Sequence, residues 1–151
     1  MTDLPPPDPA PPRRTTRPLP ARRYLPGPGI PHPSADGFRA EADFDYACDL
    51  FDHRYYWEAH EVWEAEWRTL DRDTPEAWLL QGLICGAAFV LKKHQGVEEG
   101  AKRLLGRCHL CLRAVIDHRG EVVRGIALRE LFRRLHGFSE GGPWPTLPTT
   151  G

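Results

Sequence analysis

The chain has 151 residues and 16 prolines, and twelve of the prolines fall within residues 1–33. Because proline lacks a backbone N–H and fixes φ, that segment cannot form helix interiors or central strands. The net charge of −1 provides no strong field for nucleic acid or an anionic membrane. No apolar run is long enough for a membrane helix or a signal peptide. We therefore expect a soluble cytoplasmic protein with one folded domain, a monomer or homodimer, without a membrane or nucleic-acid partner.

Two different segments precede the folded domain. Residues 1–23, which we name the arm, are rich in Pro and Arg, and we expect them to be disordered or in polyproline II conformation. Residues 24–39, which we name the strap, also contain Tyr24, Leu25 and Ile30 and two Pro-Gly pairs typical of turns. Two interpretations of the strap stay open: an extended segment docked on the domain, or a further linker.

From residue 40 onward, apolar residues recur at helical spacing. Thr74 and Pro75 have the residue types of an N-cap and a first helical position. The predicted helices cover residues 44–51, 55–70, 75–94, 97–118 and 121–136. We see no strand alternation or hairpin signal. The sequence thus predicts an all-α fold, a compact bundle of about five helices over residues 40–138, followed by a loose tail over residues 139–151.

Charge and small residues suggest how the helices pack. Residues 40–73 carry 11 acidic residues and three arginines, whereas residues 102–134 carry nine basic and three acidic residues. The simplest interpretation is complementarity between packed helices, and a basic face for an anionic partner is the lesser alternative. Gly82 and Gly86 lie on one helical face, which indicates a close helix–helix contact. Cys108 and Cys111 continue an apolar helical stripe without a second cysteine pair, so we expect core packing rather than zinc or redox chemistry.

The segment 56–68 concentrates aromatic and ionisable side chains. At 100° per residue, Tyr56, Trp63 and Trp67 share one face, which we take as the core side. Glu58 and Val62 fall mostly on the opposite side, which we expect to face solvent. His60 and Glu64 lie one turn apart between tryptophans, with Trp57 on their far side and Glu61 in a more marginal position.

Three roles for this ionisable pair stay open. His60 and Glu64 could form a purely structural hydrogen bond, ligate a divalent metal, or serve in acid/base chemistry or ligand binding without a metal. The zinc-protease pattern His-Glu-x-x-His is absent because position 64 is Glu, and the Glu-x-x-His of di-iron bundles is absent because position 57 is Trp. A third metal ligand would have to come from elsewhere, such as His32, His53 or His94.

Several blocks of the chain, in order, resemble the domain-of-unknown-function 309 family. They are Phe51, the run Tyr-Tyr-Trp-Glu-Ala-His-Glu-Val-Trp-Glu at 55–64, Trp67, Leu-Gln-Gly-Leu-Ile at 80–84, and residues 100–105. The resemblance implies a small all-helical domain and no established activity. This chain departs from the family pattern at residues 52–54, where the family has an Asn-x-Gly type of turn, and at Cys85, where it tends to have Gln.

Two function hypotheses follow, and whether the protein is an enzyme stays open. In the first, His60 and Glu64 form the centre of a metal or small-ligand site, hydrolytic in its stronger version, with Glu61 as a reserve carboxylate. Six residues are the candidates for lining that site: Tyr56, Trp57, Trp63, Trp67, Gln81 and His32. The alternative is a non-enzymatic interaction module, in which the His–Glu pair is structural and the basic arm or helices bind an acidic partner or RNA.

Overall fold

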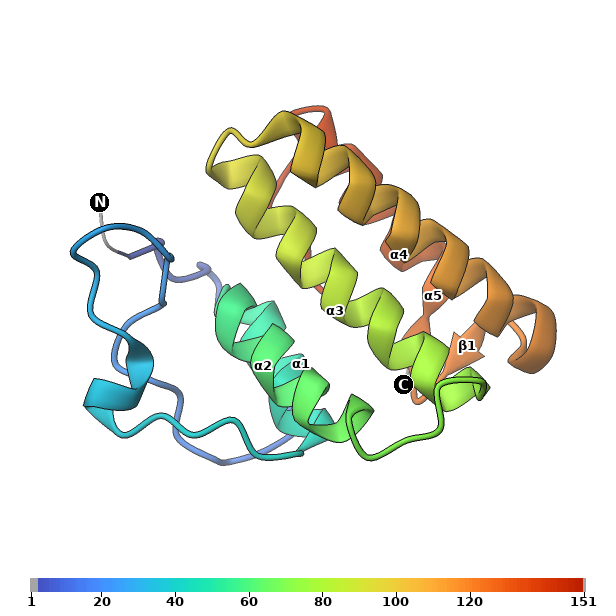
Figure 1. Ribbon diagram of the computed structural model, residues 1–151, viewed down its shortest axis with the longest axis horizontal. Coiled ribbons are helices and arrows are strands. Elements are labelled where there is room, and N and C mark those ends of the chain that lie inside the picture. Colours follow the sequence, from blue (N-terminus) through green and yellow to red (C-terminus); the bar gives the residue numbers. More distant parts are fainter. Residues whose placement is uncertain (1–2, 151) are drawn as a thin grey trace.

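The computed structural model describes residues 3–150, which form five α-helices and one short β-hairpin (Figure 1). The elements are the 3₁₀ turn η1 (Pro33–Asp36), α1 (Phe44–Asp52), α2 (Tyr56–Trp67), α3 (Pro75–His94), α4 (Glu98–Arg119), β1 (Val122–Val123), β2 (Ile126–Ala127) and α5 (Leu128–Ser139). The helices α3 and α4 lie side by side along their length, and α2 packs against α3 and α1. None of the helices in residues 3–150 has the length and apolarity needed to cross a membrane.

Helix α3 shows how local sequence sets the boundaries of an element. The Thr74 side chain accepts a hydrogen bond from Ala77 N, and Pro75 occupies the first turn. Lys92, Lys93 and His94 lie in the last turn, where positive charge is favourable. The chain then leaves the helix at Gly96, whose φ of +77° suits glycine. The predicted range for this helix is confirmed.

Glycines bring α3 close to its neighbours. A Cβ placed on Gly82 would lie 2.8 Å from Leu112 Cδ2 and 3.3 Å from Cys111 Cβ of α4. A Cβ on Gly86 would lie 3.1 Å from Leu135 Cδ1 of α5. The predicted close contact is therefore confirmed, because only glycine leaves room for the facing side chains.

The cysteines of the CxxC motif are packing residues. Cys108 is fully buried and Cys111 is half-buried. Burial raises the pKa of the Cys111 thiol, and it raises the pKa of the neighbouring Cys85 to about 11. Thiols with raised pKa values are poor nucleophiles and poor metal ligands at neutral pH, so these features agree with the predicted core role.

A β-hairpin stands where the sequence predicted the start of the fifth helix. Val122 pairs with Ala127 and Val123 with Ile126, and the turn residues Arg124 and Gly125 both have positive φ. Such two-residue turns fit the twist of an antiparallel pair. The prediction of a helix from residue 121 was wrong because two-residue strands show no alternation. Ile126 also pairs with Thr149, so a distant segment helps to hold the hairpin.

The C-terminal tail is packed rather than loose. Leu147 is 4% exposed, and its N–H donates to Asp52 Oδ1 at 2.7 Å. Pro145 O accepts a hydrogen bond from the Tyr56 hydroxyl at 3.0 Å. The expectation of a loose tail was based on its Pro, Gly and Thr content, whereas its order comes from polar partners on α1 and α2.

The arm is ordered over residues 3–23, the part that the structure describes, so the prediction that this segment is disordered was wrong. Arg13 forms an ion pair with Asp49 of α1, and Arg17 with Asp43, the N-cap of that helix. Arg23 is 6% exposed, and its Nε donates to His53 O at 2.8 Å. Composition predicts disorder because the arm has few apolar residues to bury. Here the ordering comes instead from charge-assisted hydrogen bonds to α1, which composition does not report.

The strap lies against α2. Leu25 is 9% exposed, and Tyr24 N donates to Glu58 Oε2 at 2.9 Å. Tyr24 and His32 both contact the Trp57 ring, with ring centroids 4.8 and 5.1 Å away. Of the two interpretations of this segment, these contacts favour the docked one.

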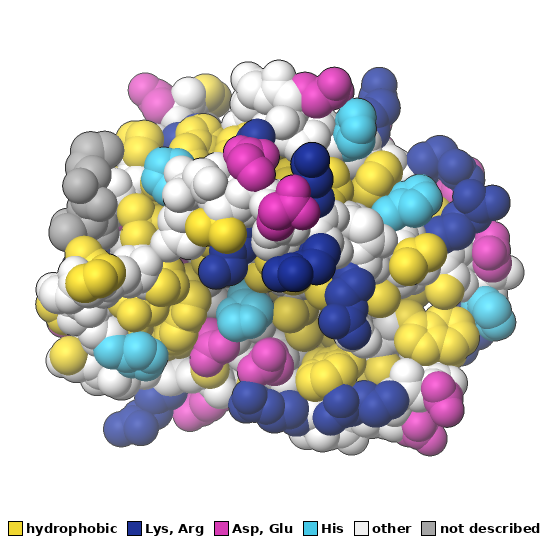
Figure 2. Space-filling view, turned by 45° about the horizontal axis from the view of Figure 1, so that its top comes forward, with side chains coloured by type: hydrophobic (Ala, Val, Ile, Leu, Met, Phe, Trp, Pro, Cys, Tyr) yellow, Lys and Arg dark blue, Asp and Glu magenta, His cyan; other side chains and the backbone are white. Residues whose placement is uncertain are grey.

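Opposite charges lie next to one another on the surface. Arg124 pairs with Glu66 at 3.1 Å and Arg119 with Glu76 at 3.2 Å, which joins the basic second half of the chain to the acidic first half. Figure 2 shows basic and acidic side chains interleaved on one face, with hydrophobic side chains between them. Asp45 and Asp49 of α1 and its N-cap Asp43, by contrast, pair with the arm.

Candidate functional site

The candidate site lies on one stripe of α2. Trp57, His60, Glu61 and Glu64 have the spacing i, i+3, i+4 and i+7, which places them on the same side of a helix. The side chains of His60, Glu61 and Glu64 are 22%, 28% and 24% exposed. They are thus accessible to a small ligand, yet partly shielded by the elements that pack around α2.

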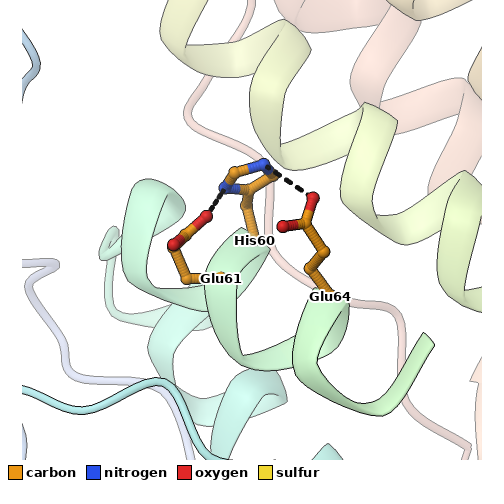
Figure 3. Close-up of side chains that lie close together, drawn as sticks. All are labelled: His60, Glu61 and Glu64. Atoms are coloured by element: carbon orange, nitrogen blue, oxygen red, sulfur yellow. Dashed lines mark ion pairs between the residues drawn. The ribbon is translucent and has the colours of Figure 1, made fainter. Parts of the chain in front are cut away.

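His60 lies between the two carboxylates (Figure 3). Its Nδ1 is 3.3 Å from Glu61 Oε2, and its Nε2 is 3.9 Å from Glu64 Oε2. One ligand atom from each of the three residues can be chosen so that all lie within 4.8 Å of one another. Among the described residues, this is the one group of three or more His, Cys, Asp or Glu side chains that could hold a metal ion.

The two ring nitrogens of His60 differ in their surroundings. Nδ1 is buried and has no hydrogen-bond partner, although the Glu61 carboxylate is within ion-pair distance. A small rotation of the Glu61 side chain would supply that partner. A carboxylate at one ring nitrogen fixes the proton there and leaves the other nitrogen free to bind a metal or a proton. In this arrangement the free nitrogen is Nε2, which faces Glu64.

Glu64 is shared between His60 and Arg68. Its Oε1 pairs with the Arg68 guanidinium one turn further along α2, while Oε2 points towards His60. The Arg68 side chain is 67% exposed. Because exposed ion pairs of this kind contribute little to stability, a cation of higher charge could replace Arg68 at Glu64 at small cost.

Two of the predicted lining residues lie in the core instead. Tyr56 is 1% exposed and Trp63 is fully buried. The Tyr56 ring contacts Phe51, and the Trp63 ring contacts Phe51 and Phe44. These two side chains therefore hold α2 against α1 and are not walls of an accessible site.

The other predicted residues are dispersed around α2. Trp57 and His32 contact each other one turn before His60, and His32 Nδ1 also bonds Ser34. Trp67 is covered by the Arg72 guanidinium at 3.6 Å from its ring centroid. Gln81 is partly exposed. Within residues 3–150, His32 is not part of the three-residue group.

The histidines considered as a third metal ligand lie elsewhere. His53 is 6% exposed, and burial lowers its pKa. His94 contacts the Trp144 ring, with centroids 5.2 Å apart. Glu61, which the sequence analysis named as a reserve carboxylate, is the residue that lies with His60 and Glu64 in the structure.

Glu58 is the residue that sequence reasoning placed on the wrong side. Both Glu58 and Val62 are fully buried rather than facing solvent. Burial raises the pKa of the Glu58 carboxyl to about 7, Tyr24 N donates to one oxygen, and the other oxygen has no partner. The helical wheel failed here because the strap covers this face. The apolar Tyr24 and Leu25 in the strap were the available signal.

Comparison with known proteins gives a family and no function. No curated protein and no solved structure matches the chain. Residues 44–104, which include α1, α2, α3 and the candidate site, match the model of a family described as a domain of unknown function, DUF309. The similarity to the DUF309 family extends over residues 44–104 of the 151-residue chain.

Proposed function

We propose that this protein binds a divalent transition-metal ion on α2 and uses it for hydrolytic chemistry. The metal ligands are His60 Nε2 and a Glu64 carboxylate oxygen, and Glu61 holds the His60 ring through Nδ1. The observation that carries the proposal is the position of His60 between two carboxylates, with Nε2 facing Glu64 at 3.9 Å.

The donor set suits a borderline metal ion. Imidazole and carboxylate together are typical ligands of Zn²⁺, Mn²⁺ and Fe²⁺. An ion placed between Nε2 and Oε2 would be about 2.0–2.2 Å from each atom, which a separation of 3.9 Å permits. Two ligands from one helix leave several coordination positions free for water and substrate. Free positions are a mark of catalytic rather than structural metal sites.

The chemistry that such an ion supplies is activation of a bound water molecule. A bound divalent ion lowers the pKa of water towards neutrality and polarises a carbonyl or phosphoryl oxygen. The protein's own contribution is the orientation of the ring: with the proton held at Nδ1 by Glu61, His60 presents a lone pair at Nε2. The same orientation would serve a metal-free variant in which His60 acts as a general base.

Metal titration tests the proposal. The chain is stripped with a chelator and titrated calorimetrically with Zn²⁺ and with Mn²⁺. We expect one ion per chain, and we expect His60→Ala and Glu64→Gln each to weaken binding by at least about tenfold. His136→Ala is the matched control, since His136 and Glu140 form another i,i+4 pair without a second carboxylate. Absence of uptake, or equal losses in His60→Ala and His136→Ala, would contradict the proposal.

An interaction role through a free basic arm is not favoured. Arg13, Arg14, Arg17 and Arg23 each form an ion pair with an aspartate of the same chain. They would have to leave these partners before they could bind an acidic protein or RNA.

A further inference from the structure

Helix α1 and Tyr55 present a surface built to hold a proline- and arginine-rich peptide. It consists of two tyrosines and three aspartates, and we name it the tyrosine–aspartate face: Asp43, Asp45, Tyr46, Asp49 and Tyr55. In this structure the arm occupies it. The contacts are of three kinds, and all of them match features of a peptide rather than features of a helix partner.

The first kind of contact is a hydrogen bond to the backbone of the arm. The Tyr46 hydroxyl donates to Pro18 O at 2.7 Å, and the Tyr55 hydroxyl donates to Pro20 O at 2.6 Å. The two accepting carbonyls are two residues apart in an extended stretch. Polyproline II segments leave their carbonyls without internal partners. Aromatic grooves that recognise proline-rich peptides exploit this preformed conformation.

The second kind of contact binds the arginine side chains of the arm. The Arg17 guanidinium lies 4.1 Å from the Tyr46 ring centroid, and the Arg23 guanidinium lies 4.2 Å from that of Tyr55. Each tyrosine therefore binds a carbonyl with its hydroxyl and a cation with its ring. Arg17 also pairs with Asp43 at 3.2 Å. The two tyrosines therefore select a peptide in which both the arginine side chains and the accepting carbonyls have the correct spacing.

The third contact is a buried anchor. Asp49 is 1% exposed, and its carboxylate accepts hydrogen bonds from Arg14 N at 2.7 Å, Thr15 N at 2.9 Å and Thr15 Oγ1 at 2.7 Å. Arg13 Nε adds a fourth at 3.4 Å. A buried carboxylate without such donors would be strongly destabilised. Asp49 therefore demands a ligand that brings several N–H and O–H groups.

The tyrosine–aspartate face and its occupant belong to different parts of the chain. Tyr46, Asp49 and Tyr55 lie within the DUF309 match, whereas the arm ends more than twenty residues before it. We propose that this face is a binding site for a proline- and arginine-rich segment of a partner protein. The segment presents Arg-Pro-x-Pro in extended form, and the arm is a built-in competitor that the partner displaces.

The tether sets the expected strength of that competition. A linked segment acts at an effective concentration of the order of 1 mM. If the arm and a free peptide of the same sequence each bind the open face with a dissociation constant near ~100 µM, the peptide's apparent dissociation constant for the intact chain is about tenfold higher. Disabling the arm while keeping the face intact should restore the lost affinity.

The test uses the full chain. Arg13→Glu with Arg17→Glu reverses the charges that face Asp49 and Asp43 and leaves the face unchanged. The probe is a fluorescent peptide with the sequence of residues 11–23, and binding is measured by anisotropy. We expect the double variant to bind the peptide about tenfold more tightly than the intact chain does. Adding Tyr46→Phe and Tyr55→Phe to the double variant should abolish the gain. A peptide carrying the two Glu substitutions is the matched control and should not bind.

Two results would overturn the proposal. One is equal binding of the natural and charge-reversed peptides by a double variant that circular dichroism shows to be folded. The other is dimerisation of the intact chain in light scattering with the peptide as competitor, which would assign the face to the arm of a second copy. If the double variant does not fold, the test is made on the natural chain, whose amide shifts are measured by NMR with millimolar peptide. Amide shifts confined to residues 43–55 and to the displaced arm support the proposal, and their absence contradicts it.

Discussion

Helix α3 is packed against α4, and helix α1 is packed against the arm and the C-terminal tail, but different interactions hold the two contacts together. Between α3 and α4, Gly82 leaves space that Leu112 fills, and the contact is apolar. On α1, buried Asp49 and Asp52 receive backbone N–H groups from the arm and from the C-terminal tail. One chain therefore combines an apolar contact, in which the side chains fit by shape, with segments that are held on the surface of a helix by hydrogen bonds to buried aspartates.

Enlarging Gly82 should have the largest effect on stability. In Gly82→Leu, the new side chain must displace Leu112 and Cys111 of α4, so we expect a loss of about 3 kcal/mol in unfolding free energy. Gly106→Ala is the matched control, because a Cβ there meets nothing within 4 Å. It should stabilise α4 by up to about 1 kcal/mol. Chemical denaturation measures both. Equal effects of the two changes would mean that α3 and α4 are not held by shape.

Asp49→Asn should release the arm while leaving the helices folded. Arg14 N donates to Oδ1 and Thr15 N to Oδ2. The amide replaces one of these two acceptors by an N–H₂ group, and we expect a loss of about 2 kcal/mol. Trypsin should then cut after Arg14 faster than in the natural chain. Asp45→Asn is the control, since Asp45 is 59% exposed and pairs with Arg14 alone. It should change stability by less than about 0.5 kcal/mol. Unchanged cleavage in Asp49→Asn would show that the arm is held by other contacts.

Asp52 should make stability depend on pH. Burial raises its pKa in the folded state to about 7, although Leu147 N donates to it. The unfolded carboxyl titrates near ~4, so the folded state binds more protons between these values. This contribution is full below pH ~4 and is lost as pH rises through about 7. Asp52→Asn keeps an acceptor for Leu147 and removes the titration.

Urea midpoints at pH 5 and pH 8 measure this effect. The natural chain should lose on the order of 2 kcal/mol more than Asp52→Asn over that interval. The pH dependence of unfolding that other groups such as Glu58 contribute is the same in both chains and cancels in the difference. A constant difference between the two chains at both pH values would mean that Asp52 does not titrate in this range.

Removing Arg68 should have the smallest effect, on metal affinity alone. Arg68 pairs with Glu64 and competes with a cation for that carboxylate. Arg68→Gln should therefore bind Zn²⁺ or Mn²⁺ roughly threefold to tenfold more tightly in calorimetry, with the gain falling at high salt. Arg72→Gln is the control, because Arg72 covers Trp67 and does not pair with Glu64. Equal gains in both variants would point to a general charge effect.

The sequence could predict the helices and their packing, but not the contacts that the arm, the strap and the tail make with them. The long helices were predictable because apolar period, the cap at Thr74 and the paired glycines act locally or at helix spacing. His60 with Glu64 was predictable because one helical turn separates them. The order of the arm, the burial of Glu58 and the short hairpin were not. The arm and Glu58 depend on partners 26 to 36 residues away along the chain, and Ile126 of the hairpin pairs with a residue of the tail.

In the proposed site, His60 binds a metal through Nε2 while Nδ1 keeps its proton beside Glu61. Nitrogen NMR of the chain labelled with ¹⁵N-histidine reports both ring nitrogens as Zn²⁺ is added. The account predicts a shift of His60 Nε2 to a metal-bound value, with Nδ1 protonated throughout and the other histidines unchanged. Unchanged His60 nitrogens in the presence of excess metal, or a shift at Nδ1 instead, would contradict it.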